Sequence, residues 1–100
     1  MGVLDEKREE LLALCRRHRV KSLDVFGSVD TDRFGESSDL DFLVEFLEEE
    51  PVARSEAFFG LLADLEDLFD RRIDLVVDSA VTNPFFREEL EETRRSLFAA

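Results

Sequence analysis

The sequence of 100 residues contains no tryptophan and no tyrosine, and it has only one cysteine, Cys15, and one histidine, His18. A lone cysteine cannot form a disulfide within the chain, and a lone histidine cannot build a histidine-rich metal site. We therefore interpret both as ordinary side chains on the face of a helix. Any metal ion bound by this chain would be a hard cation held by oxygen ligands.

Long apolar runs are also missing. No stretch approaches the roughly eighteen apolar residues of a membrane-spanning helix, and the start MGVLDEKREE is acidic where a secretion signal would be basic. We therefore expect a cytoplasmic protein with no membrane partner. The formal net charge of −12 opposes binding to a phosphate backbone, so we expect no direct nucleic-acid binding either.

What the chain does contain is enough apolar material for one core. Hydrophobic residues make up 44% of the sequence and include ten phenylalanines, but 100 residues leave no room for a second core. We therefore expect one domain that spans residues 1–100.

Apolar periodicity predicts the secondary structure. The predicted order is helix, strand, short turn or helix, strand, helix, strand, helix, which favours a small mixed sheet of the α/β or α+β class, covered by helices on one side. Asn83 and Pro84 are typical of a helix start, and Arg94 and Arg95 suit the last turn of the same helix. The predicted helices span residues 3–19, 52–69 and 82–98, and the predicted strands span 22–26, 39–46 and 71–77.

The second predicted strand, DLDFLVEF, carries two aspartates at alternate positions. Asp39 and Asp41 share one face of the strand, roughly 6.5 to 7 Å apart along the chain, where they repel each other unless a cation lies between them. Mg²⁺ accepts a few carboxylate ligands together with phosphate oxygens. Asp74 has the same polar parity on the third strand and could complete a three-carboxylate site.

A Gly-Ser pair ends the first predicted strand. Gly27 tolerates unusual backbone angles, and Ser28 at the start of a helical turn would present N–H groups and a hydroxyl to an anion. Arg33 could add a charged contact to a triphosphate or a leaving group. Taken singly, these residues also fit a structural role: Ser28 can cap a short helix, and ESSD, which includes Ser38, can be a solvated turn.

As a set, the pattern GSVDTDRFGESSDLDFLV resembles the signature of the DNA polymerase beta-like nucleotidyltransferase superfamily. In particular it resembles the minimal nucleotidyltransferases, small prokaryotic proteins usually encoded beside a HEPN-domain partner. The resemblance extends over nearly the whole chain, including the IDLV strand and the final TNPFFREELEETRRSLFAA.

The resemblance implies a mechanism and a set of site residues. Asp39, Asp41 and Asp74 would be catalytic and would bind two Mg²⁺ ions, with Asp74 on the ion that activates the acceptor hydroxyl. The nucleotide, ATP, would be bound by Gly27, Ser28, Arg33 and Ser38, with its β and γ phosphates on the Gly-Ser pair. Family members of this type act as antitoxins that transfer AMP to a tyrosine of a HEPN ribonuclease.

One feature departs from the family pattern, and a second limits where a tyrosine acceptor can lie. Many relatives follow Gly-Ser-x with Ala-Arg-Gly, whereas this chain has Asp30-Thr31-Asp32 and places its arginine at position 33. The role of Arg33 therefore does not follow from the motif. Because the chain has no tyrosine, any tyrosine acceptor must lie on another protein.

Two other functions stay open on the sequence. A catalytically idle antitoxin would neutralise its partner by contact alone, without using Asp39 and Asp41. A nucleotidyltransferase acting on a small hydroxylated molecule is the third alternative, which we rank last because such enzymes usually carry an added substrate domain.

Overall fold

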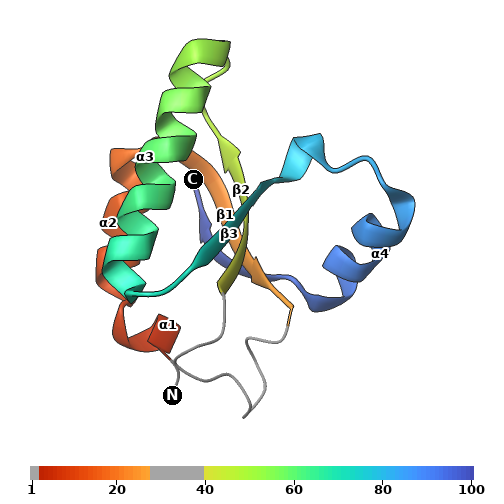
Figure 1. The fold of residues 1–100 in the computed structure, drawn as a ribbon, viewed down its shortest axis with the longest axis horizontal. Helices are drawn as coiled ribbons and strands as arrows, with labels where there is room; N and C mark the ends of the chain where they lie inside the picture. The colour runs from red at the N-terminus through yellow and green to blue at the C-terminus, as the bar shows by residue number, and fades with distance from the viewer. Residues whose placement is uncertain (1–2, 28–39) are drawn as a thin grey trace.

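The structure is a computed structural model that describes residues 3–27 and 40–100 (Figure 1). Its centre is a four-stranded sheet in the order β3-β2-β1-β4. β1 pairs antiparallel with β2 and with β4, whereas β2 and β3 are parallel. The mixed sheet with flanking helices confirms the predicted fold class. The strands are β1 (Val20–Phe26), β2 (Leu40–Phe46), β3 (Ile73–Val77) and β4 (Arg95–Ala99).

Helices α1 (Val3–Glu6), α2 (Arg8–Arg17) and α3 (Pro51–Phe69) lie on one face of the sheet (Figure 1). The predicted N-terminal helix is thus interrupted at Lys7. Alternate strand residues point toward these helices, because successive side chains on a strand face opposite sides. The main core consists of Leu4, Leu11, Cys15, Val20, Leu23, Val25, Leu40, Phe42, Val44, Phe46, Leu61, Leu65, Phe69, Ile73 and Leu75.

Helix α3 connects the parallel strands β2 and β3. Its start is fixed by the Glu50 carboxylate, which accepts hydrogen bonds from the N–H groups of Val52 and Ala53 at 3.2 and 2.7 Å. Pro51 occupies the first turn, where its missing N–H has no helical partner to lose. Asp70 ends the helix in the left-handed conformation, with φ at 51°.

The opposite face of the sheet carries the 3-10 helix η2 (Asp78–Ala80) and helix α4 (Pro84–Thr93), seen on the right in Figure 1. Leu90 of α4 is fully buried in a second cluster with Phe26 and Leu43. The expectation that helices cover the sheet on one side only was therefore wrong. Leu43 lies on the polar parity of β2, and its burial is what requires a helix on this face.

The C-terminal segment also differs from the prediction of one helix over residues 82–98. Asn83 caps α4 as expected, but the helix ends at Thr93 and the chain continues as β4. Arg94 has extended backbone angles and its side chain contacts the sheet. β4 then pairs with β1, with Leu23 opposite Phe98, so that tertiary pairing of an otherwise open strand edge outweighs the helical pattern. None of the described helices is long and apolar enough to cross a membrane.

Candidate active site

Asp41 on β2 and Asp74 on β3 are register partners in the parallel ladder. Adjacent strands lie roughly 4.8 Å apart, and register partners project from the same face of the sheet. Asp41 is half-buried and Asp74 is exposed, so the pair opens to solvent at the start of both strands. Mg²⁺ prefers carboxylate oxygens as ligands, so these two side chains fit this ion by their chemistry.

Gly27 lies directly beside Asp41. β1 places Phe26 opposite Asp41, and Gly27 follows with φ at +84°, in the region that favours glycine. A Cβ atom at Gly27 would lie 3.1 Å from Asp41 Oδ2, closer than an ordinary van der Waals contact. The first residue of the Gly-Ser pair and one of the predicted metal ligands are thus brought together by β1 and β2.

The other predicted site residues fall in the segment 28–39. Asp39, which directly precedes β2, lies outside the described residues, as do Ser28, Arg33 and Ser38. Within residues 3–27 and 40–100, no group of three or more histidine, cysteine or acidic side chains gathers to hold a metal ion. Of the predicted set, the structure therefore brings together Gly27, Asp41 and Asp74.

Sequence reasoning did not identify Thr93 as a neighbour of this site. The N–H of Gly27 donates a hydrogen bond to Thr93 Oγ1 at 3.3 Å, and the Thr93 hydroxyl in turn donates to the carbonyl oxygen of Glu89 at 3.0 Å. The two partners are 66 positions apart in the sequence, and no local pattern signals the contact.

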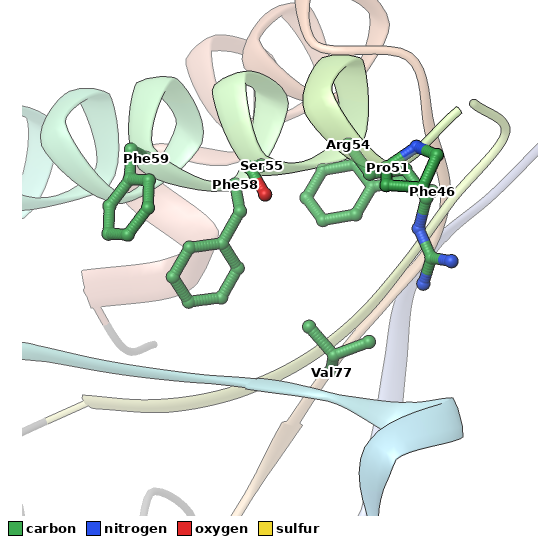
Figure 2. A pocket seen from close by; sticks show the side chains of 7 residues that line it. All are labelled: Phe46, Pro51, Arg54, Ser55, Phe58, Phe59 and Val77. Atoms are coloured by element: carbon green, nitrogen blue, oxygen red, sulfur yellow. The ribbon is translucent and has the colours of Figure 1, made fainter. Parts of the chain in front are cut away.

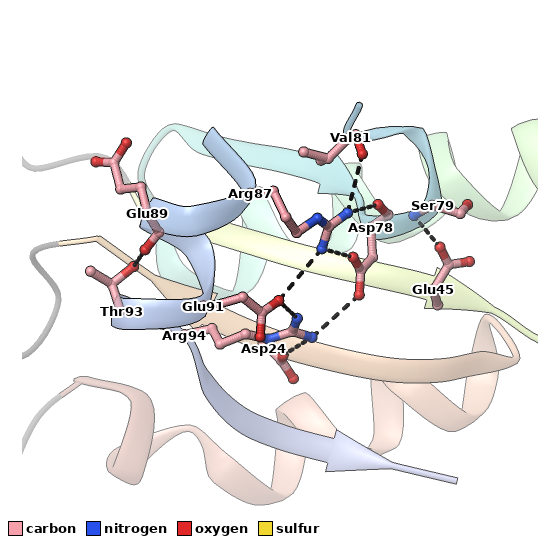
Figure 3. A network of polar contacts seen from close by, with 10 residues as sticks. All are labelled: Asp24, Glu45, Asp78, Ser79, Val81, Arg87, Glu89, Glu91, Thr93 and Arg94. Atoms are coloured by element: carbon pink, nitrogen blue, oxygen red, sulfur yellow. Dashed lines mark hydrogen bonds and ion pairs between the residues drawn. The ribbon is translucent and has the colours of Figure 1, made fainter. Parts of the chain in front are cut away.

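An ion-pair network next to Thr93 was also missed (Figure 3). Arg94 Nε donates to Asp24 Oδ2 at 2.6 Å, and the same guanidinium contacts Asp78 at 3.2 Å and Glu91 at 2.9 Å. Asp24 is 6% exposed and sits between two buried residues of β1. A carboxylate within an apolar strand such as SLDVF is the sequence signal that predicts a buried cationic partner.

The network protects the positive charge of Arg94. Burial by itself would lower the pKa of the Arg94 guanidinium, but hydrogen bonds to Asp24 and Glu91, with the charges of Asp24 and Asp78, outweigh it and raise the pKa above its usual value. Arg87 also joins Asp78 to α4, at 2.6 Å, so the end of β3 and the helix are held together (Figure 3). The face that carries Asp41 and Asp74 is therefore fixed by charge as well as by packing.

The lone cysteine and histidine serve the packing of α2. Cys15 is fully buried, and this burial raises the pKa of its thiol to about 12, with the nearby charge of Arg16 acting weakly in the opposite direction. His18 Nε2 lies 2.6 Å from Asp64 Oδ2 on α3. These contacts join α2 to the core and to α3.

A separate pocket of about 380 Å³ lies at the other end of β2 and β3, against the first half of α3 (Figure 2). Phe46 and Val77 line it, and both are the last residues of their strands. Asp41 and Asp74 lie at the opposite ends of the same strands, so the pocket is not part of the carboxylate site. Its lining residues are Phe46, Pro51, Arg54, Ser55, Phe58, Phe59 and Val77.

A family model identifies the class of protein to which this sheet and its carboxylate pair belong. Residues 7–97 match the family model described as "Nucleotidyltransferase domain". The chain therefore belongs to the nucleotidyltransferase domain family and is a nucleotidyltransferase enzyme.

Two relatives are similar to this chain over most of its length. A solved structure described as a "putative minimal nucleotidyltransferase" is 34% identical, with a TM-score of 0.70 and 95% of each chain covered. A protein of Methanocaldococcus jannaschii, "Putative protein adenylyltransferase MJ0128", is 36% identical over 90% of this chain and 89% of its own length. The resemblance to the minimal nucleotidyltransferases is thus confirmed.

The fold also recurs in more distant proteins. A Shewanella oneidensis structure, in which a tri-AMPylated HEPN toxin is in complex with an MNT antitoxin, matches with a TM-score of 0.67 and 19% identity. The match covers 98% of this chain and 74% of that one. A toxin-antitoxin structure with AMP-PNP matches with a TM-score of 0.69 and 20% identity, over 93% of this chain and 73% of that one. At these identities the similarity concerns the fold.

Proposed function

We propose that this chain is a Mg²⁺-dependent adenylyltransferase that transfers AMP from ATP to a hydroxyl group of a HEPN-type partner protein and so acts as the antitoxin of a toxin–antitoxin pair. The acceptor would be a tyrosine. One observation carries the proposal: Asp41 and Asp74 are register partners, and Gly27, which follows β1, lies against Asp41. The names of the relatives and of the toxin–antitoxin neighbours support ATP as the nucleotide and a HEPN-type protein as the partner.

The roles of the site residues follow from their positions and from the family motif. Asp41 and Asp74, with Asp39, would hold the metal and orient the α phosphate toward the acceptor. Gly27, Ser28, Arg33 and Ser38 would bind the nucleotide. When bound, Mg²⁺ would neutralise charge that develops on the attacking and leaving oxygens.

The bonds formed and broken in the proposed transfer balance without a further reagent. The acceptor oxygen forms a bond to the α phosphorus, the bond from that phosphorus to the bridging oxygen breaks, and pyrophosphate leaves. The hydroxyl proton passes to water. The chain has no tyrosine of its own, so a tyrosine acceptor must come from the partner. We further propose that residues 1–100 form one catalytic domain that works in the cytoplasm, where ATP and the partner are made.

The test separates an enzyme from an antitoxin that works by contact alone. The partner's ribonuclease activity is measured after incubation with ATP, Mg²⁺ and either the wild type or the Asp41→Asn, Asp74→Asn double variant. We expect neutralisation by the wild type and none by a double variant that still forms the complex. Equal neutralisation by both would overturn the enzymatic proposal and favour an idle antitoxin.

A further inference from the structure

The last turn of α4 meets the predicted nucleotide site through one side chain, Thr93. Its hydroxyl proton is engaged by the carbonyl oxygen of Glu89 at 3.0 Å, so a lone pair of Oγ1 is directed outward. That lone pair accepts the N–H of Gly27 at 3.3 Å. The hydroxyl thus has a fixed orientation and accepts a backbone hydrogen bond at the point where β1 ends.

The geometry points to Thr93 as a positioning residue for the nucleotide and metal site, acting through the backbone of Gly27. This inference rests on the proposed function. Gly27 lies against Asp41, since a Cβ atom there would be 3.1 Å from Oδ2. A shift of Gly27 would therefore move the backbone at the end of β1 relative to a predicted metal ligand.

Thr93 is itself held from two directions. The next residue, Arg94, is bonded to the buried Asp24 on β1 and to Asp78 after β3. One turn before Thr93, Leu90 is fully buried on the sheet. The last turn of α4, which carries the hydroxyl, is therefore held rigidly. A side chain must be held in this way to position a neighbouring backbone group.

The contact also assigns a role to Gly27. Because its N–H is donated to Thr93, Gly27 serves the site by bringing backbone close to Asp41 without a side chain. The C-terminal helix thereby becomes part of the nucleotide site.

Two substitutions at Thr93 and one elsewhere isolate the hydrogen bond. Thr93→Val keeps the side-chain shape and removes the acceptor, whereas Thr93→Ser keeps the hydroxyl. Thr82→Val makes the same chemical change at an exposed position before α4. All three use the full chain, with AMP-PNP and Mg²⁺ as the probe.

The first measurement is the exchange rate of the Gly27 amide proton by NMR in the protein without nucleotide. The loss of one hydrogen bond predicts exchange about two- to tenfold faster in Thr93→Val. The second measurement is the Kd of AMP-PNP, which we expect to rise by a similar factor, with the KM for ATP rising and kcat changing less. Thr93→Ser and Thr82→Val should stay within about twofold of the wild type.

The outcomes separate this inference from the function on which it rests. If the wild type binds AMP-PNP and Thr93→Val binds it equally well, the positioning role is overturned while the proposed function stands. If Thr93→Val and Thr93→Ser weaken binding equally, the hydroxyl is not responsible and the inference is again overturned. If the wild type does not bind AMP-PNP at all, the proposed function fails and the inference with it.

Discussion

Asp41 and Asp74 face the same side of the sheet from neighbouring parallel strands, one strand spacing apart and in register. They come from segments separated by the whole of α3, and the parallel pairing that this helix permits is what joins them. In the proposed function, these two carboxylates would hold a divalent cation that neutralises charge on the phosphate during transfer.

The first prediction concerns Asp74, the more exposed of the two. Asp74→Asn removes one negative charge from the site with almost no change in shape, so we expect the rate of AMP transfer to fall about 10²-fold or more. Asp67→Asn changes an exposed aspartate of α3 and should leave the rate unchanged. Radiolabel transfer from ATP measures both. A normal rate for Asp74→Asn would remove this residue from the site.

The second prediction concerns the glycine beside Asp41. Gly27→Ala introduces a Cβ atom at a φ of +84°, at a cost of about 1 to 2 kcal/mol in folding free energy, and pushes against Asp41 Oδ2. We expect activity to fall further than this loss of stability explains, because the carboxylate must move.

Gly60→Ala is the matched control for Gly27→Ala. Its Cβ atom would lie 2.9 Å from the His18 ring, where α2 meets α3, and not in the site. It should alter the free energy of unfolding without altering the rate. If the two variants change activity to the same extent, the close approach of Gly27 to Asp41 has no functional role.

The third prediction concerns the buried ion pair. Arg94→Met leaves the carboxylate of Asp24 buried without its cation, so we expect the free energy of unfolding in urea to fall by about 3 to 5 kcal/mol. The double variant Asp24→Leu, Arg94→Met should recover much of this loss, because it removes the buried charge as well. Arg8→Met, on the exposed side of α2, is the control. A loss below about 1 kcal/mol in Arg94→Met would show that the pair is not important for folding.

The fourth prediction concerns Cys15. Burial raises its pKa to about 12, so at pH 8 about one thiol in 10⁴ is ionised in the folded protein, against about one in ten for an unfolded thiol with a pKa of 9.0. A thiol reagent should therefore label the native protein only as fast as it unfolds. Between pH 9 and 12 the unfolded chain loses this proton and the folded chain retains it, so this residue's contribution to stability declines as pH rises. Rapid labelling of native protein at pH 8 would contradict the burial.

The sequence predicts much of this fold because its apolar periodicities are regular. The stripe of α3 and the alternation in β2 each specify one element, and the predicted bounds differ from the observed ones by about one residue. Asp41 and Asp74 could be placed on one face because parity along a strand is a local property. Their register could not be predicted, because it depends on how β2 and β3 pair.

The C-terminal segment shows why the remainder was not predictable. The residues after Thr93 continue a helical pattern, yet they form β4, because the edge of β1 offers backbone partners and Asp24 offers a partner for Arg94. Both partners are about 70 positions away in the sequence, and neither is visible in a local window. The contact between Thr93 and Gly27 was missed for the same reason.

The direct test of the proposed AMP transfer is the intact mass of the proposed HEPN-type partner protein. It is incubated with the purified 100-residue protein, ATP and Mg²⁺, and in parallel with the Asp41→Asn variant. We predict that its mass increases by one or more AMP units with the wild type and stays constant with the variant. An unchanged mass in both reactions, or the same increase in both, would contradict the account.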